Sequence, residues 1–360
     1  MILQNSLLVN LSFLAQKPTG ITTYAANLFP HLQPLQPTLL ISSEARPKAL
    51  KAEYYPVPPN LTPDYGSLGH FRRLLWTQLQ IPKIYKELRS RLLFSPVPEA
   101  PLQTNCRYIV NVNDLIPLHF PSRSPLTLYF RYYVPQVLAQ AEHILCISTA
   151  TAKDLTHFYN IKPDKITSIL LAHDANHFRF LDLPTSNYFL YIGRHDPYKN
   201  LQRVITAFAA LPRDYELWLA GPFDPRYTPA LQTVAAELNI SDRVKILDYV
   251  KYQDLPTIIN QAIALVFPSL WEGFGLPVLE AMACGTPVIT SNVSSLPEVA
   301  GDAALLVDPY NTAEITAAMQ AVATESGLRS RLSEQSRVRA NNFNWAKTGQ
   351  ATAEVLARYL

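Results

Sequence analysis

Two glutamates stand eight positions apart in the segment SLWEGFGLPVLEAMACG, which covers residues 269–285. Glu272 precedes a glycine-rich turn, and Glu280 lies about one helical turn beyond Pro277. Proline is favoured in the first turn of a helix and glycine just past its end, so Pro277 and Gly285 predict a short helix between them. This spacing places two carboxylates near the positive end of one helix.

The turn that leads into the helix supplies backbone amides. It consists of Gly273, Phe274, Gly275 and Leu276. Its glycines let the amides approach a ligand closely, and free amides at a helix N-terminus favour an anion such as a diphosphate. Carboxylates repel phosphate, so Glu272 and Glu280 are expected to bind the hydroxyl groups of a hexose and a ribose on its two sides. Singly, either glutamate could be solvated or complement the helix dipole; together with the glycines they favour a site for a nucleotide sugar.

Two cations follow an apolar strand in the segment YIGRHDPYKNLQRVITAF. The strand ends at Gly193, and a helix begins near Leu201, so Arg194 and Lys199 lie at the carboxyl end of a parallel strand, where ligands of open α/β sheets bind. We expect both to hold the diphosphate. The chain has no D-x-D pair, so no metal site is predicted and catalysis without a divalent metal is expected.

The length and patterning of the chain predict two domains. At 360 residues and 48% hydrophobic, it is too long for one ordinary core. Short apolar runs alternate with stretches of helical spacing, which predicts an α/β fold with doubly wound parallel sheets. We expect a boundary near residue 180, giving domains over 1–180 and 181–343. Residues 44–67 combine prolines with tyrosines and predict a long surface loop.

Charge and composition exclude several classes of protein. The formal net charge is +3 with only 16% charged residues, so nucleic acid is not an expected partner. No uncharged apolar run approaches the roughly 20 residues that span a bilayer. Gln4, Asn5 and Asn10 interrupt the apolar N-terminus, which we interpret as a first buried strand. We expect a cytoplasmic protein, or one peripheral at the inner face of the membrane.

Two nucleotide-binding motifs are absent from the sequence. Neither G-x-G-x-x-G nor G-x-x-x-x-G-K-[ST] occurs, which disfavours a dehydrogenase and a P-loop kinase.

The segments GRHDPYKN and FPSLWEGFGLPVLEAMACGTPVITSNVSSLPEVAGDAALLVDP resemble the retaining glycosyltransferases of family 4, whose fold is GT-B. The glutamate spacing is similar to the E-x7-E signature of that family. The resemblance implies two Rossmann-like domains facing a cleft, with the donor on residues 188–300 and the acceptor on residues 1–180. The ending FNWAKTGQATAEVLARYL resembles the family's last helix, so 344–360 is expected to pack back on the first domain.

The resemblance also assigns roles to other residues. It carries a glycine loop near the donor phosphate to Gly20, and it places Asn113 and Asp114 beside the reacting centre with Glu272. Many relatives have histidine before this aspartate, and asparagine can hydrogen-bond but cannot become cationic. Contacts to the base are largely made by backbone in this fold, and we expect them near Tyr249 and Val250.

These observations predict a retaining hexosyltransferase without a cofactor. The hexose passes from a nucleotide diphosphate sugar to a hydroxyl of a glycan or lipid-linked acceptor. GRHDPYKN and VNDLIPLHFP resemble the mannosyltransferase-like branch, so GDP-mannose is the first expectation for the donor and a UDP-sugar the second. A sugar-nucleotide epimerase of the same fold and a non-catalytic nucleotide-sugar-binding subunit remain alternatives.

A basic segment in the first domain leaves membrane contact open. Residues 70–91 combine apolar residues at helical spacing with one acid, Glu87, and six bases: Arg72, Arg73, Lys83, Lys86, Arg89 and Arg91. Such a helix could rest on anionic lipid, but Pro82 interrupts it, and a core-packing helix with a solvated basic face fits equally well.

Overall fold

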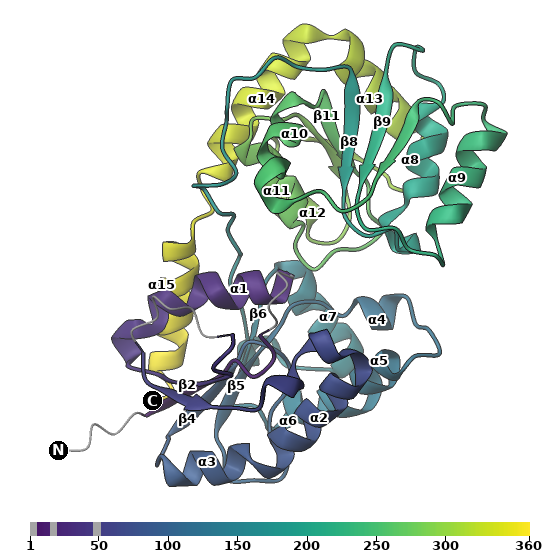
Figure 1. The fold of residues 1–360 in the computed structure, drawn as a ribbon. Coiled ribbons are helices and arrows are strands. Elements are labelled where there is room, and N and C mark those ends of the chain that lie inside the picture. Colours follow the sequence, from purple (N-terminus) through teal and green to yellow (C-terminus); the bar gives the residue numbers. More distant parts are fainter. Residues whose placement is uncertain (1–5, 15–19, 46–51) are drawn as a thin grey trace. The chain divides into compact units, whose positions relative to one another are not determined.

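The structure is a computed structural model that divides the chain into two compact units (Figure 1). Unit 1 is drawn from residues 1–171 and 345–360, and unit 2 from Ala172–Asn344. The residues that the structure describes are 6–14, 20–45 and 52–360.

The division falls at residue 171 rather than near 180, because the following residues bond within unit 2. The N–H of Leu181 donates to Asn260 Oδ1 at 2.8 Å, and Asn260 Nδ2 donates to the carbonyl of Arg179 at 3.0 Å. These side-chain contacts reach across some 80 positions of sequence, so no local feature near residue 180 indicates them.

Unit 1 is built on a seven-stranded parallel sheet in the order β3-β2-β1-β4-β5-β6-β7. Its strands are β1 (Leu7–Asn10), β2 (Thr38–Ile41), β3 (Tyr54–Pro56), β4 (Leu92–Ser95), β5 (Tyr108–Val112), β6 (His143–Cys146) and β7 (Ile166–Ser168). Its helices are α1 (Gly20–Leu28), α2 (Gly66–Leu79), α3 (Ile81–Glu87), α4 (Ile116–His119), α5 (Pro125–Leu128), the π-helical turn η4 (Tyr129–Tyr133), α6 (Val134–Gln140), α7 (Thr149–Tyr159) and α15 (Trp345–Ala357). The five strands β1, β2, β4, β5 and β6 are buried along their whole length, which explains why they read as continuous apolar runs.

Unit 2 is built on a six-stranded parallel sheet in the order β10-β9-β8-β11-β12-β13. Its strands are β8 (Tyr188–Ile192), β9 (Glu216–Ala220), β10 (Val244–Leu247), β11 (Ala264–Phe267), β12 (Val288–Ser291) and β13 (Leu305–Val307). Its helices are α8 (Leu201–Phe208), α9 (Thr228–Glu237), α10 (Leu255–Gln261), α11 (Leu276–Ala283), α12 (Leu296–Ala300), α13 (Thr312–Thr324) and α14 (Ser326–Ala340). When the strands of each sheet are numbered in sequence order, unit 2 runs 3-2-1-4-5-6 and unit 1 runs 3-2-1-4-5-6-7. Both contain the doubly wound Rossmann arrangement, with one added edge strand in unit 1, so the predicted fold is confirmed.

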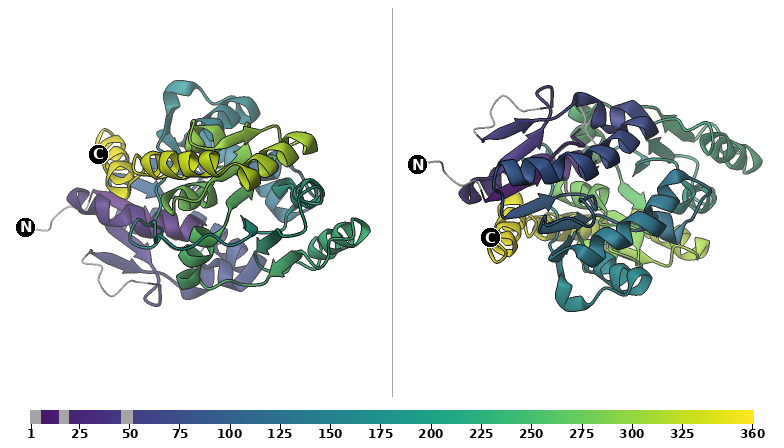
Figure 2. Two further views of the ribbon diagram at one scale, coloured as in Figure 1. Left: turned by 90° about the horizontal axis from the view of Figure 1, so that it is seen from above. Right: turned by 90° about the horizontal axis from the view of Figure 1, so that it is seen from below.

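The last helix, α15, packs in unit 1. Thr348 Oγ1 donates to the carbonyl of Leu170 at 2.8 Å, and the rings of Trp345 and Tyr24 lie 6.4 Å apart. Gly349 lies so close to His31 that a Cβ there would overlap its side chain. Figures 1 and 2 show α15, yellow at the end marked C, lying against the purple α1.

The proline-rich segment is not a loop throughout. Residues 46–51 lie outside the described part, and Tyr54–Pro56 form β3 at the edge of the sheet, paired with β2. An edge strand tolerates proline because one side of its backbone makes no ladder hydrogen bonds. The expected N-terminal strand is β1, although Gln4 and Asn5 lie outside the described residues.

Gly221 meets Gly193 at the carboxyl ends of β9 and β8, where a Cβ on Gly221 would overlap the carbonyl oxygen of Gly193. We expect Gly221→Ala to lower the free energy of unfolding by about 2 kcal/mol, because backbone on both sides must shift. Thermal denaturation measures the change. The control is Gly327→Ala in α14, where an added Cβ meets nothing within 4 Å and alanine stabilises a helix by up to about 1 kcal/mol. Equal melting temperatures of the two variants would contradict the expectation.

Candidate active site

The central strands of unit 2 bring the predicted donor residues together. β8 and β11 are neighbours in the sheet although β9 and β10 intervene in sequence. This is the point where the strand order reverses, and ligands of doubly wound sheets bind there at the carboxyl ends. The segment after β8 carries Arg194 and Lys199, and the segment after β11 carries Glu272.

Lys199 and Glu272 form a salt bridge, with Nζ 2.6 Å from Oε1. Their side chains are only 13% and 9% exposed, and the ammonium lies over the rings of Tyr198 and Phe267, 5.1 and 5.2 Å from the ring centroids. A charge pair so far withdrawn from water is held firmly, because each charge would be costly to bury alone. The pair therefore fixes an ammonium group directly next to a carboxylate.

Two serines hold the turn that carries Glu272. Its backbone N–H donates to Ser294 Oγ at 3.2 Å, and Ser295 Oγ donates to the carbonyls of Glu272 and Phe274 at 3.0 and 2.8 Å. Sequence reasoning did not single out these serines. Nothing in their spacing indicates the contact, since they precede α12 and look like ordinary helix-capping residues.

The predicted helix is α11, which begins at Leu276. Gly275 precedes it with φ +107°, a left-handed conformation, and a Cβ there would lie 2.7 Å from Leu296 Cδ2. The positive φ favours glycine at this position, and an added Cβ would also displace the end of the Leu296 side chain. Gly273 and Phe274, in the same turn, are buried as well.

Glu280 lies partly buried on α11, and burial raises the pKa of its carboxyl to about 7. The pKa of Tyr252 is raised to about 12, chiefly by burial and then by the charges of Asp174 and Glu280. Glu280 is thus poised between its two protonation states near neutral pH, so a ligand that hydrogen-bonds the carboxylate will change its titration.

The segment after β10 carries Tyr249, which is exposed, and Val250, which is half-buried. Tyr252, at the start of the 3-10 turn Tyr252–Asp254, stacks on His177 with ring centroids 3.8 Å apart, and His177 Nε2 lies 2.7 Å from the Tyr252 carbonyl. His177 therefore positions the segment where base contacts are expected. Nothing in the local sequence indicates this contact, because 75 positions separate the two residues.

Arg194 differs from Lys199 in its surroundings. Its side chain is 65% exposed, and its Nε lies 3.0 Å from Asp196 Oδ2. The neighbouring His195 is buried, with Nδ1 2.8 Å from Thr228 Oγ1. Of the two predicted cations, Lys199 is therefore withdrawn from water, whereas Arg194 is exposed and paired with Asp196.

The predicted residues of the first domain lie in unit 1. Gly20 is the first residue of α1 and is exposed. Asn113 and Asp114 follow β5: Asn113 Oδ1 accepts from Asn111 Nδ2 at 3.0 Å, whereas its buried Nδ2 has no partner among the described residues. Asp114 Oδ1 accepts from the N–H of Ile116 at 3.1 Å, at the start of α4. The Asn113 amide therefore offers a hydrogen-bond donor at this strand end, whereas the Asp114 carboxylate acts as an acceptor.

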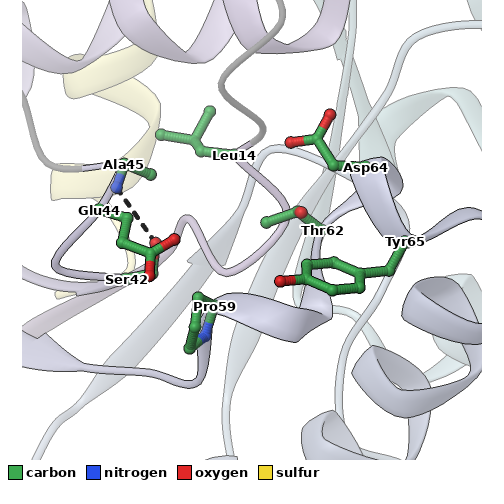
Figure 3. A pocket seen from close by; sticks show the side chains of 8 residues that line it. All are labelled: Leu14, Ser42, Glu44, Ala45, Pro59, Thr62, Asp64 and Tyr65. Atoms are coloured by element: carbon green, nitrogen blue, oxygen red, sulfur yellow. Dashed lines mark hydrogen bonds between the residues drawn. The ribbon is translucent and has the colours of Figure 1, made fainter.

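A pocket of 290 Å³ opens in unit 1 beyond the carboxyl ends of β1 and β2. Figure 3 shows the carboxylates of Glu44 and Asp64 and the phenol of Tyr65 at its wall. The other lining residues are Leu14, Ser42, Ala45, Pro59 and Thr62. Carboxylates and a phenol beside apolar surface are groups that hydrogen-bond hydroxyls.

Within residues 6–14, 20–45 and 52–360, no three His, Cys, Asp or Glu side chains gather as a metal-binding group. Among the helices of these same residues, none is both long and apolar enough to cross a membrane.

Comparison with known proteins gives matches over nearly the whole chain. Residues 173–339 match the family described as Glycosyl transferases group 1, and residues 18–176 match Glycosyltransferase Family 4. The chain is 28% identical to the O-antigen chain mannosyltransferase RfbU of Salmonella typhimurium, over 84% of this chain and 87% of that protein. It is 31% identical to the O-antigen chain mannosyltransferase B of Escherichia coli, over 60% and 61% of the two chains.

Solved structures share the fold. A sucrose-phosphate synthase from Thermosynechococcus elongatus aligns with a TM-score of 0.75 at 19% identity, over 98% of both chains. Anabaena HepE in complex with UDP and glucose aligns with a TM-score of 0.74 at 17% identity, over 98% of this chain and 99% of that one. Because its two halves match these two family descriptions in succession over residues 18–339, the chain belongs to the glycosyltransferases of group 1 and family 4 and is a GT-B glycosyltransferase.

Proposed function

We propose that this glycosyltransferase transfers a hexose from a nucleotide diphosphate sugar to a hydroxyl of a glycan or lipid-linked saccharide, with retention at the anomeric carbon. Mannose is the first candidate for the hexose. The observation that carries the proposal is the Lys199–Glu272 pair at the switch point of unit 2, a cation and a carboxylate 2.6 Å apart. A sugar diphosphate presents an anion joined directly to a ring of hydroxyls. Both members of the pair can then bind the same ligand.

Each side chain of unit 2 has one task in this proposal. Lys199 and Arg194 bind the diphosphate, and the amides at the start of α11 add the helix dipole. Glu272 accepts hydrogen bonds from the hexose, and Glu280 from the ribose. The base contacts the backbone near Tyr249 and Val250.

The names of relatives support mannose as the transferred sugar. RfbU and the O-antigen mannosyltransferase B are both named as mannosyltransferases, which favours GDP-mannose as donor. HepE is described in complex with UDP and glucose, so a UDP-sugar is the second choice.

The acceptor occupies unit 1 in this proposal. The pocket lined by Glu44, Asp64 and Tyr65 provides acceptors for saccharide hydroxyl groups, and the Asn113 amide provides a donor. The acceptor oxygen bonds to the anomeric carbon as the bond to the diphosphate breaks, and the acceptor proton passes to the departing phosphate oxygen on the same face.

Titration calorimetry with GDP-mannose, UDP-glucose and ADP-glucose, followed by product analysis with a lipid-linked saccharide acceptor, tests the proposal. We expect GDP-mannose to bind most tightly and its mannose to appear on the acceptor in the α configuration. A β-linked product would contradict retention. Conversion of the sugar nucleotide into another sugar nucleotide in the absence of an acceptor would indicate an epimerase. Donor binding without any turnover would indicate a non-catalytic subunit. Either result would overturn the proposal.

The pH dependence of donor binding should report on Glu280. A carboxylate accepts more hydrogen bonds than its protonated form, so ribose favours the charged state, and below the pKa of about 7 binding must first remove a proton. We expect donor affinity to weaken as pH falls, by up to about tenfold per pH unit below 7. Calorimetry on the intact donor, whose diphosphate does not titrate in this range, measures the slope. Glu280→Gln should bind more weakly and with a flat profile; an unchanged slope in this variant would assign the effect to another group.

Transfer should proceed without a divalent metal, since Lys199, Arg194 and the start of α11 supply positive charge for the leaving diphosphate. We expect the rate in excess EDTA to equal the rate in Mg²⁺. A glycosyltransferase known to need Mn²⁺ serves as the control for chelation. Loss of activity in EDTA that Mg²⁺ restores would refute this expectation.

A further inference from the structure

Asn200 lies between Lys199 and helix α8 and has a left-handed backbone, with φ +66° and ψ +24°. It directly follows the 3-10 turn η6 (Pro197–Lys199) and occupies the N-cap position of α8. An asparagine at this position ordinarily accepts a hydrogen bond from the first turn of the helix, but the side chain of Asn200 makes no such bond. Glycine would suffice for the backbone conformation alone. The amide side chain must therefore be explained by its other contacts.

The Asn200 side chain joins three connections of unit 2. Its Nδ2 donates to the carbonyl of Pro268, directly after β11, at 3.0 Å and to the carbonyl of Pro309, shortly after β13, at 2.6 Å. Its Oδ1 accepts from Arg203 Nη1 at 2.9 Å. Carbonyls only accept and a guanidinium only donates, so these partners fix which end of the amide faces each of them. Asn200 is only 4% exposed, so these bonds are shielded from water.

Two hydrogen bonds bracket Lys199 and join its turn to the connection after β11. On one side of the lysine, the carbonyl of Tyr198 accepts from the N–H of Leu270 at 2.7 Å. On the other side, Asn200 donates to the carbonyl of Pro268. The same connection leads on to the glutamate that pairs with Lys199. The two members of the salt bridge are thus held by their backbones as well as by their charges.

The connection after β11 is also held from its other side. Thr290 Oγ1 donates to the carbonyl of Phe267 at 2.9 Å, and Ser291 Oγ donates to the carbonyl of Ser269 at 2.6 Å. Both hydroxyls belong to β12. The connection is therefore fixed between β12 and the turn after β8, and Asn200 supplies the side-chain bond on the β8 side.

We propose that Asn200 is a positioning residue for the transfer reaction, because it holds Lys199 and Glu272 in the relative placement in which both bind one sugar diphosphate. The inference rests on the proposed function, in which the lysine binds the diphosphate and the glutamate binds the hexose. Asn200 contacts neither group of the donor in this arrangement and acts through Lys199. Such placement matters for rate, since a misplacement of about 1 Å can cost about a hundredfold.

Asn200→Gly tests this role, because glycine keeps the left-handed backbone and removes the amide. We expect turnover to fall at least about tenfold and affinity for GDP to weaken about tenfold. KM for the acceptor should not change, because the acceptor binds unit 1 in the proposed function. The matched control is Asn239→Gly, an exposed asparagine of unit 2 whose φ of +55° is also left-handed. It should match wild type in all three quantities.

A double-mutant cycle with Lys199→Met separates positioning from a general loss of stability. When the lysine is absent, Asn200→Gly should weaken GDP binding less than about twofold. Calorimetry on the four chains of the cycle measures the coupling. Equal losses of GDP affinity in both backgrounds would overturn the proposal, because the amide would then support only the fold.

Arg203→Met provides a second test that leaves Asn200 in place. It removes the donor to Asn200 Oδ1, while its side-chain stem still covers the ring of Tyr310, over which the guanidinium lies at 5.5 Å. We expect turnover and GDP affinity to fall about threefold, as for the loss of one hydrogen bond. Arg213→Met, an exposed arginine of unit 2, controls for the change in charge. If Asn200→Gly does not fold, wild-type values for Arg203→Met would overturn the proposal.

Hydrogen exchange of the ligand-free chain separates failure of this inference from failure of the proposed function. Asn200→Gly should speed exchange in peptides that cover 194–200 and 268–275, including the amide of Leu270, whereas Asn239→Gly should not. Unchanged exchange in both segments would overturn the positioning role. Faster exchange in a protein whose wild type binds no nucleoside diphosphate would refute the proposed function and support the link between the two connections.

Discussion

Glu272→Gln is expected to lower turnover about a hundredfold, while affinity for the bare nucleoside diphosphate stays unchanged or rises slightly. The carboxylate contacts only the hexose in the proposed arrangement, so its loss is felt where the hexose develops charge in the transition state. Lys199 loses its partner at 2.6 Å and is then more available to phosphate. Single-turnover kinetics and calorimetry with GDP measure the two quantities.

The control for this variant is Glu334→Gln, an exposed glutamate on α14, which should match wild type in both measurements. Glu280→Gln provides the contrast, since it should weaken binding of donor and nucleotide alike. Equal losses of GDP affinity in the Glu272 and Glu280 variants would mean that both acids serve the ribose or the helix.

Lys199→Met is expected to lower turnover at least about a hundredfold and to weaken binding of the nucleoside diphosphate as well, because in the proposed arrangement the lysine faces the phosphate in both ligands. It should also destabilise unit 2, because Glu272 is then left withdrawn from water without its counter-charge. Turnover, GDP affinity and melting temperature measure the three effects.

The double variant Lys199→Met with Glu272→Gln separates stability from catalysis. Removing both charges should restore most of the melting temperature but none of the turnover. Lys153→Met, an exposed lysine on α7, controls for a general change in charge. Recovery of turnover together with stability would show that the pair is only structural, and near-normal turnover of Lys199→Met would refute its role in transfer.

Local chemistry made much of unit 2 predictable. The apolar runs that become β8 and β11 are short and bounded by turn residues, because strands buried on both faces need no polar alternation. Proline and glycine at the ends of α11 act through their own backbone preferences, so the helix begins within a residue of the expected position. The same reasoning failed at Tyr54–Pro56, because only the presence of β2 alongside makes an edge strand of that segment.

The sequence by itself determined the α/β class, the two-part organisation, and the identity of the acids and cations around the Gly273–Leu276 turn, since these depend on residues within a few positions of one another. Only the tertiary structure decided which of these groups meet. Lys199 reaches Glu272 across 73 positions of sequence. The serines that hold the turn of Glu272 lie in the connection between β12 and α12. Arg73 likewise turns inward only because Glu99 is buried opposite it, and this leaves the leucines of α2 outside. Such pairings follow from the order of strands in a sheet and from the cost of burying a lone charge, neither of which is encoded in any local stretch of residues.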